Sequence, residues 1–251
     1  MTHLEAKFGY NKLFAINQDV MWARKSAEVL TGILKKQKWD IVGTVAYPAG
    51  ATDYSAGLMK ARASGAQIIF AAFDLPQAGV LVKQWRSMKV PALMAGVIAS
   101  MCGPESWEGF DRKISGAINM MMEIGNMPVP KVPASVRFYD AYKKRWGEDI
   151  QDPHGAAGSY EAVYVLAEAI KRAGTIEADA LVAALEKTDR IGTIGRIRFD
   201  EGHQTLFGND PTQKAMGCVM QWRDGGKRVV VHPKSIADDT VKLPSWMKPA
   251  K

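Results

Sequence analysis

The first half of the chain alternates between short apolar runs and longer amphipathic stretches. The predicted strands cover residues 13–16, 41–46, 67–72 and 92–95. The predicted helices cover residues 21–36, 53–65 and 75–88. Strands and helices that alternate at this spacing favour right-handed crossovers and a parallel sheet covered on both faces. The pattern therefore predicts an α/β fold.

The second half is mostly helical and has few strands. Residues 115–122 look like one more strand, and a proline-punctuated loop follows. Further predictions are helices at 133–146, 158–173 and 178–187, and strands at 192–199, 216–222 and 228–232. An amphipathic helix must bury its apolar stripe on another element. The stripe of the middle helix, which includes Tyr160 and Val163, lacks an evident partner sheet in this chain.

Polar residues stand where several predicted strands end. Asn17, Gln18 and Asp19 follow the first strand, and Trp22 lies at the start of the next helix. In open α/β sheets, ligands bind beyond the carboxyl ends of the strands. Asp19 is also placed to cap the exposed amides of that helix. For Trp22, core packing and ligand contact are equally good interpretations, and Asp74 is favoured as a helix cap.

Composition narrows the classes of function. The chain has 251 residues, 47% of them hydrophobic, and a formal net charge of +7. Its basic runs are scattered, which favours solvated surfaces over a nucleic-acid or anionic-membrane patch. Cys102 and Cys218 are too few for a disulfide framework, and two buried thiols are favoured over one disulfide. The run at 90–102 is too short to span a bilayer, and the first residues lack the apolar segment of a signal peptide.

Common catalytic and cofactor motifs do not occur in the sequence. The first junction has no glycine and so cannot form a dinucleotide-binding fingerprint. The four histidines are isolated and none stands at metal-ligand spacing with a second ligand. No Gly-x-Ser-x-Gly nucleophile elbow is present. We therefore expect no enzyme activity, no cofactor and no metal site.

Several motifs follow one another in an informative order. A strand ends in Gln18-Asp19, Trp22 opens the next helix, and Asp53-Tyr54-Ser55 follows the second strand. The later stretches are "RFYDAYKKRWG", "SYEAVYVLAEAIKRAG" and "IGRIRFDEGHQ". In this order they resemble the periplasmic leucine/isoleucine/valine-binding proteins of ABC transporters, which are type I solute-binding proteins. The match covers nearly the whole chain.

The resemblance implies a two-lobed fold with the ligand in the cleft between the lobes. Residues 13–122 and 216–251 would form the second, C-terminal lobe around a complete parallel sheet. Residues 124–205 would be a partial first, N-terminal lobe, mostly helical, without its main sheet. The family pattern thus implies that this chain is an N-terminally truncated fragment, which would explain the helices without a partner sheet.

Binding residues follow from the resemblance position by position. The aromatic residue at the helix start is Trp22, and the loop after the third strand is Phe73-Asp74-Leu75. The loop after the fourth strand carries an acidic residue in the family, whereas Val97 and Ile98 stand here, with Ile98 the nearest match. Together with Asn17, Gln18 and Asp19 these residues form the predicted ligand site. An ammonium group buried without a counter-charge is costly, so this departure favours a more apolar ligand, unless Asp74 supplies the charge.

The implied function is solute capture for an ABC importer, without chemistry on the solute. The expected ligand is a small carboxylate or amide with an aromatic or aliphatic body, with a branched-chain amino acid as second choice. For the full-length protein, the expected partner is the transporter permease and the expected location is the periplasm. No nucleic acid partner and no membrane insertion are expected. The alternative is a ligand-sensing domain of a receptor or regulator on the same fold. An upstream signal peptide would favour capture, and an upstream helix-turn-helix would favour regulation.

Overall fold

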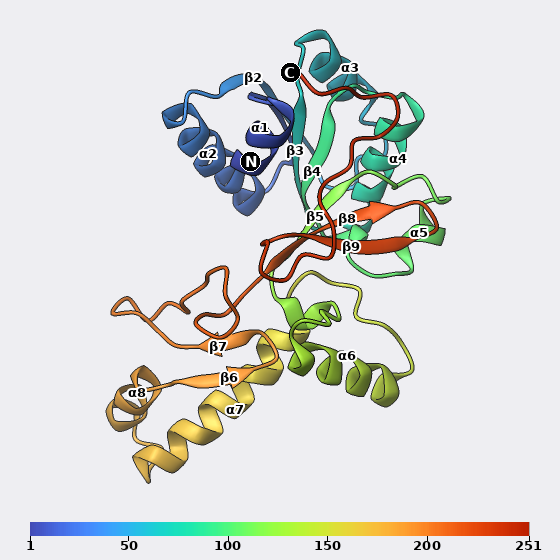
Figure 1. Ribbon diagram of the computed structural model, residues 1–251. Coiled ribbons are helices and arrows are strands. Elements are labelled where there is room, and N and C mark those ends of the chain that lie inside the picture. Colours follow the sequence, from blue (N-terminus) through green and yellow to red (C-terminus); the bar gives the residue numbers. More distant parts are fainter. Residues whose placement is uncertain (251) are drawn as a thin grey trace. The chain divides into compact units, whose positions relative to one another are not determined.

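The computed structural model describes residues 1–250, apart from the side chains of Thr2 and Gln77. The chain folds into two compact units (Figure 1). Unit 1 comprises residues 1–120, residues 220–229 and the chain from Val241 onward. Unit 2 comprises residues 121–219 and 230–240. This division differs from the predicted lobes in placing 230–240 with the helical unit, and the assignment of units to lobes stays a prediction.

Most of a largely parallel sheet belongs to unit 1, and only residues 121, 218–219 and 230–232 of its strands are assigned to unit 2. Its strands are β1 (Lys12–Gln18), β2 (Asp40–Tyr47), β3 (Ile68–Phe73), β4 (Leu93–Ile98), β5 (Ile118–Met121), β8 (Cys218–Arg223) and β9 (Lys227–His232). Their order is β2-β1-β3-β4-β5-β8-β9, and the neighbours from β2 to β5 pair in parallel. Every residue of β3 is buried, as expected for a strand covered on both faces. The predicted α/β fold is confirmed.

The helices of unit 1 cover both faces of this sheet. They are α2 (Met21–Lys36), α3 (Ser55–Ala63) and α4 (Gly79–Ser87), with the 3₁₀ turn η1 (Pro76–Ala78) before α4. The chain moves outward from β1 to β2 and then back across β1 to β3, so right-handed crossovers put α2 and α3 on opposite faces. The helix predicted at 75–88 begins only at Gly79, because residues from Pro76 to Ala78 form a 3₁₀ turn.

The N-terminal helix α1 (Thr2–Phe8) was not predicted from the sequence. Its residues Leu4 and Phe8 are buried, and the helix is hydrogen-bonded to the end of the chain, which is far away in sequence. Lys7 Nζ donates to the carbonyl of Val241 at 2.7 Å, and the Ala250 amide donates to Phe8 at 2.8 Å. Two further short elements are η2 (Ala99–Met101) and α5 (Ser106–Gly109).

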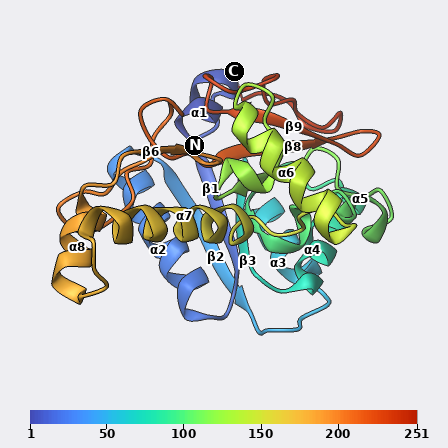
Figure 2. The same cartoon turned by 90° about the horizontal axis from the view of Figure 1, so that it is seen from below.

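Unit 2 consists of helices and a small hairpin. Its elements are η3 (Ile124–Asn126), α6 (Pro133–Trp146), α7 (Ala156–Ala173), α8 (Ala178–Glu186), β6 (Arg190–Gly192) and β7 (Gly195–Ile197). Figure 2 shows α7 running between α8 at one end and α6 near the other. The single strand predicted at 192–199 is an antiparallel hairpin, because Gly195 adopts φ +95° and turns the chain.

Helix α7 buries a face other than the predicted stripe. Its buried residues are Ala157, Glu161, Val165 and Ala169, spaced four apart along one side. Tyr160 and Val163, which belong to the predicted stripe, are 40% and 67% exposed. The expectation that this helix leaves apolar side chains uncovered is therefore confirmed for the described chain.

The N-terminus of α7 is capped by side chains from the segment after β5. The Glu123 carboxylate accepts hydrogen bonds from the Gly155 amide at 3.1 Å and from Asn126 Nδ2 at 2.6 Å. Asn126 Oδ1 in turn accepts the Ala157 amide at 2.9 Å. Burial raises the pKa of Glu123, although these hydrogen bonds and His154 act in the opposite direction.

This raised pKa gives a testable pH dependence of stability. Because folded Glu123 holds its proton more tightly than the unfolded chain does, stability is expected to fall as pH rises through the interval between the two pKa values. Glu123→Gln removes the titration, so its melting temperature relative to the unsubstituted protein should rise from about pH 4 to about pH 7. A pH-independent difference for Glu123→Gln would contradict the assignment.

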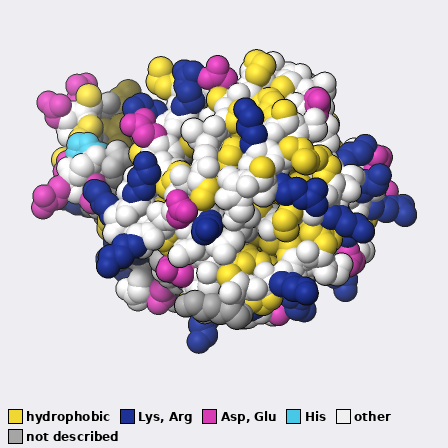
Figure 3. Space-filling view, turned by 90° about the horizontal axis from the view of Figure 1, so that it is seen from above, with side chains coloured by type: hydrophobic (Ala, Val, Ile, Leu, Met, Phe, Trp, Pro, Cys, Tyr) yellow, Lys and Arg dark blue, Asp and Glu magenta, His cyan; other side chains and the backbone are white. Residues whose placement is uncertain are grey.

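The two cysteines are buried thiols and are not joined by a disulfide, as expected. Cys102 accepts a hydrogen bond from Asn119 Nδ2 at 3.0 Å and contacts the carbonyl of Ile98 at 3.6 Å. On the face shown in Figure 3, Lys and Arg side chains are found on every side, with carboxylates and uncharged groups among them. This mixture of charges fits the expectation of solvated surface.

Candidate functional site

The predicted site residues of unit 1 lie at the carboxyl ends of adjacent strands. Strand pairing sets Asn17 of β1 opposite Ala72 of β3, and Phe73 opposite Ile98 of β4. Parallel strands end on the same edge of a sheet, so the three junctions lie next to one another. The sheet register thus brings together residues that are far apart in sequence.

A chain of hydrogen bonds links the junctions after β1 and β3. Trp22 Nε1 donates to Asp74 Oδ2 at 2.8 Å, and the Asp74 amide donates to Gln18 Oε1 at 3.2 Å. Gln18 is buried and Asp74 is exposed. The buried Gln18 thus holds the backbone of Asp74, and the Trp22 indole in the first turn of α2 holds its exposed carboxylate at the edge of the sheet.

Asp19 does not cap α2, which corrects the expectation from the sequence. The N-cap residue is Val20, in an extended conformation, and no side chain bonds to the first helical amides. Because the helix starts one residue later than a cap at Asp19 requires, the carboxylate reaches Arg24 and forms an ion pair with its guanidinium. Asp74 likewise caps no helix, since α4 starts at Gly79.

The junction after β4 is apolar and its backbone is already hydrogen-bonded. Ile98 is 1% exposed. Its amide donates to Asn119 Oδ1 at 2.9 Å, and its carbonyl accepts from Asn119 Nδ2 at 2.9 Å. Val97 is half-buried, and so is Leu75 in the neighbouring junction. The Ile98 side chain is thus part of the core rather than of an open surface.

Two features near these junctions were missed by sequence reasoning. Asn119 is completely buried in β5, and its position in an apolar run was a signal, since a buried amide needs partners. The Tyr54 ring packs edge-on against Phe73, with centroids 5.7 Å apart, and against Tyr47 at 4.9 Å. These rings hold the junction after β3 against the one after β2.

Asn17, one of the predicted site residues, is buried and donates through its side chain to the carbonyl of Gln18 at 3.1 Å.

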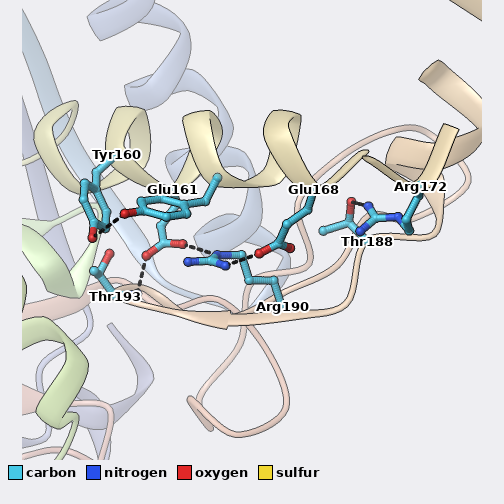
Figure 4. Close-up of polar contacts among 8 residues, drawn as sticks. Tyr160, Glu161, Glu168, Arg172, Thr188, Arg190 and Thr193 are labelled. Atoms are coloured by element: carbon cyan, nitrogen blue, oxygen red, sulfur yellow. Dashed lines mark hydrogen bonds and ion pairs between the residues drawn. The ribbon is translucent and has the colours of Figure 1, made fainter. Parts of the chain in front are cut away.

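Unit 2 contains a buried ionic network between α7 and the hairpin (Figure 4). Glu161 is 2% exposed and accepts from Arg190 Nε at 2.8 Å and from the Thr193 amide at 2.6 Å. Arg190 also pairs with Glu168, and its guanidinium lies over the Tyr164 ring at 4.6 Å. Burial acts to lower the pKa of Arg190, but the two carboxylates outweigh it and the pKa is raised.

A surface cavity of about 430 Å³ lies beside this network in unit 2. Its walls include Phe138, Tyr142, Trp146 and Tyr160. None of the predicted ligand-binding residues lines it. The Glu161 carboxylate, which also lines it, already accepts from protein donors. We therefore regard the strand ends of unit 1, with their fixed polar groups, as the better candidate site.

Within residues 1–250, no cluster of three or more His, Cys, Asp or Glu side chains could hold a metal ion. None of the helices in the same part of the chain is long and apolar enough to cross a membrane.

A family model described as periplasmic binding protein matches residues 1–227. The chain belongs to the periplasmic binding protein family. This periplasmic binding protein is 24% identical over 236 residues to Leu/Ile/Val-binding protein homolog 7 of Brucella suis. The aligned region covers 93% of this chain and 58% of that relative. The chain thus spans well under two thirds of the length of the curated protein it matches.

Solved structures confirm the type I periplasmic-binding-protein fold. A putative branched-chain amino acid ABC transporter protein from Silicibacter pomeroyi superposes with a TM-score of 0.82 at 18% identity. That match covers 98% of this chain and 65% of the other. LivJ from Streptococcus pneumoniae, solved in complex with isoleucine, superposes with a TM-score of 0.71 at 23% identity, over 92% of this chain and 63% of LivJ. Identities this low show the fold alone.

Proposed function

We propose that the protein is the solute-binding component of an ABC importer, with unit 1 as its second lobe. The whole protein captures a small solute in the periplasm, delivers it to the transporter permease and performs no chemistry on it. The observation that carries the proposal is the Trp22–Asp74–Gln18 chain at the carboxyl edge of the sheet. This edge is where ligands of open α/β folds bind.

The expected ligand has a small apolar or aromatic body. It is a carboxylate or amide of that type, or a branched-chain amino acid. The half-buried Leu75 and Val97 supply apolar surface over the buried Phe73 and Ile98, and Trp22 supplies an aromatic ring for the body of the solute. The family relatives named for leucine, isoleucine and valine are consistent with a solute of this size.

Unit 2 is, in this proposal, part of the first lobe, whose main sheet lies outside this chain. The exposed side chains of Tyr160, Val163, Tyr164 and Leu166 support it, since a helix of a soluble protein normally turns its apolar side chains inward. The cavity beside α6 and α7 would then be a packing surface for that sheet. The chain's 58% share of its curated relative leaves room for such a segment.

Calorimetry on the full-length protein tests the proposed site. Titration with leucine, valine and a panel of aromatic carboxylates identifies the solute. Trp22→Ala is expected to weaken binding about tenfold to a hundredfold, because the loss of an aromatic contact costs roughly 1–3 kcal/mol. Met21→Ala is the matched control, since this neighbour on α2 is 76% exposed. Equal affinities of the two variants would contradict the proposed site.

A further inference from the structure

A line of aromatic rings runs along the cavity of unit 2. The ring centroids of Phe138 on α6 and Tyr160 on α7 lie 4.8 Å apart. Tyr142 lies 6.4 Å from Phe138, and Trp146 lies 6.5 Å from Tyr142, so the line continues to the end of α6. All four rings line the cavity, and they give it a wall that suits an apolar occupant.

Two guanidinium groups line the same cavity without a counter-charge. Arg137 and Arg145 both belong to α6. No carboxylate of residues 1–250 lies within ion-pair distance of either group. The Arg145 guanidinium lies instead over the Trp146 ring, 5.3 Å from its centroid. Both arginines are exposed in this chain, so water solvates their charge.

The carboxylates nearest to the cavity already serve another arginine. Glu161 and Glu168 both pair with Arg190. Neither of them can turn to the two arginines of α6 without taking a counter-charge from Arg190. The counter-charge for α6 therefore has to come from outside the described chain.

Thr193 adds a second polar group that lacks a partner. The residue is 5% exposed and lines the cavity, and its hydroxyl has no hydrogen-bond partner within residues 1–250. Figure 4 shows this hydroxyl pointing toward Tyr160, which lines the cavity as well. Buried polar groups are nearly always hydrogen-bonded, so an orphaned hydroxyl beside a cavity indicates a missing partner.

In the proposed function, the first-lobe sheet covers this surface and takes water away from it. Arg137 and Arg145 would then lose solvation on the side that the sheet contacts. A buried charge without a partner is strongly unfavourable, whereas a carboxylate hydrogen-bonded to a guanidinium offsets the loss of water. An entirely apolar covering segment would leave both groups unsatisfied.

We propose that the segment packed on this cavity carries at least one Asp or Glu, whose carboxylate pairs with Arg137 and Arg145 beside the aromatic rings. The occupant is the first-lobe segment of the full-length protein that lies outside this chain, which spans 58% of its curated relative. The proposal rests on the proposed function and specifies the chemistry of one of its contacts. Thr193 supplies a further hydrogen bond to the same segment.

Arginine labelling tests whether the cavity is covered. Phenylglyoxal modifies accessible guanidinium groups, and mass spectrometry of the peptides gives the rate at each position. Arg137 and Arg145 are expected to react at least about tenfold more slowly in the full-length protein than in the 251-residue chain, because a covered group reacts only after local opening. Arg62, an exposed arginine of α3 in unit 1, is the control and should react equally in both.

The double variant Arg137→Gln/Arg145→Gln tests whether a carboxylate meets these groups. In the full-length protein it should lower the melting temperature by at least about 5 °C, because it leaves a buried carboxylate unpaired. In the 251-residue chain the change should stay within about 1 °C, since both side chains are exposed. Lys144→Gln, at an exposed position of α6 outside the cavity wall, is the matched control and should be neutral in both lengths.

The two measurements separate this inference from the function on which it rests. Protection of both arginines together with the loss of stability supports the ion pair. If the arginines are protected but the double variant leaves the melting temperature of the full-length protein unchanged or raises it, the covering segment brings no carboxylate. The inference is then wrong, and the proposed function stands. If both arginines react equally in the two lengths, nothing covers the cavity, and the assignment of unit 2 to the first lobe fails together with the inference.

Discussion

Replacement of Glu161 by alanine is expected to lower the free energy of unfolding by about 3–5 kcal/mol, the cost of breaking a buried ion pair from one side. The Glu161 carboxylate holds α7 to the hairpin through Arg190 and the Thr193 amide. Its removal leaves that amide buried without an acceptor and takes one carboxylate from Arg190. Urea unfolding followed by circular dichroism measures the loss.

The matched control is Glu168→Ala, which removes the other carboxylate bound to Arg190. The Glu168 side chain is 38% exposed, so solvent screens its ion pair and the expected loss is about 0.5–1 kcal/mol. Gly192 adds a second check, since a Cβ there would clash with the Glu161 carboxylate. Gly192→Ala is thus expected to be destabilising. If Glu161→Ala and Glu168→Ala both lower the free energy of unfolding by the same small amount, the role assigned to Glu161 is wrong.

The second large effect concerns the uncovered side of α7 and depends on the length of the chain. In the 251-residue chain, Val163→Asp is expected to change the free energy of unfolding by no more than about 0.5 kcal/mol, because the side chain is 67% exposed. Self-association should decrease, since exposed apolar patches favour it. In a longer form that contains the proposed first-lobe sheet, the same substitution should cost at least about 3 kcal/mol, because it buries an unpaired carboxylate.

Val165→Asp is the control for this comparison. Val165 is 6% exposed on the opposite side of the same helix, so its substitution should destabilise both lengths of the chain. Sedimentation velocity and chemical unfolding of the two variants in both lengths provide the measurements. If the 251-residue chain stays a clean monomer at high concentration, and Val163→Asp is neutral in the longer form, the proposed covering sheet is wrong.

Local patterns were sufficient for most of the fold. The helix predicted at 133–146 matches α6, because Pro133 opens it and Gly147 closes it with φ +76°. Failures came where the decisive contact is distant in sequence or where one residue bends the chain. Helix α1 is held by the far end of the chain, and Gly195 divides what looked like one strand.

The candidate site was predictable to the level of neighbouring strand ends. Alternating strands and helices imply a parallel sheet, and a parallel sheet brings Gln18, Phe73 and Ile98 to one edge. The pairing of side chains was not predictable. Asp19 could have capped a helix or bound an arginine, and only the start of α2 at Met21 decides between them. The bond from Trp22 to Asp74 spans 52 positions, which no local pattern encodes.

The division of the chain into two units has a practical consequence for anyone who cuts or recombines it. Unit 1 is assembled from three separate stretches, and the chain passes between the units near residues 120, 219, 229 and 240. One nick by a protease at any of these places leaves both units joined by the remaining passages. Exchange of unit 1 with that of a relative therefore needs three grafted segments, and a simple truncation after residue 120 would remove the strands that complete its sheet.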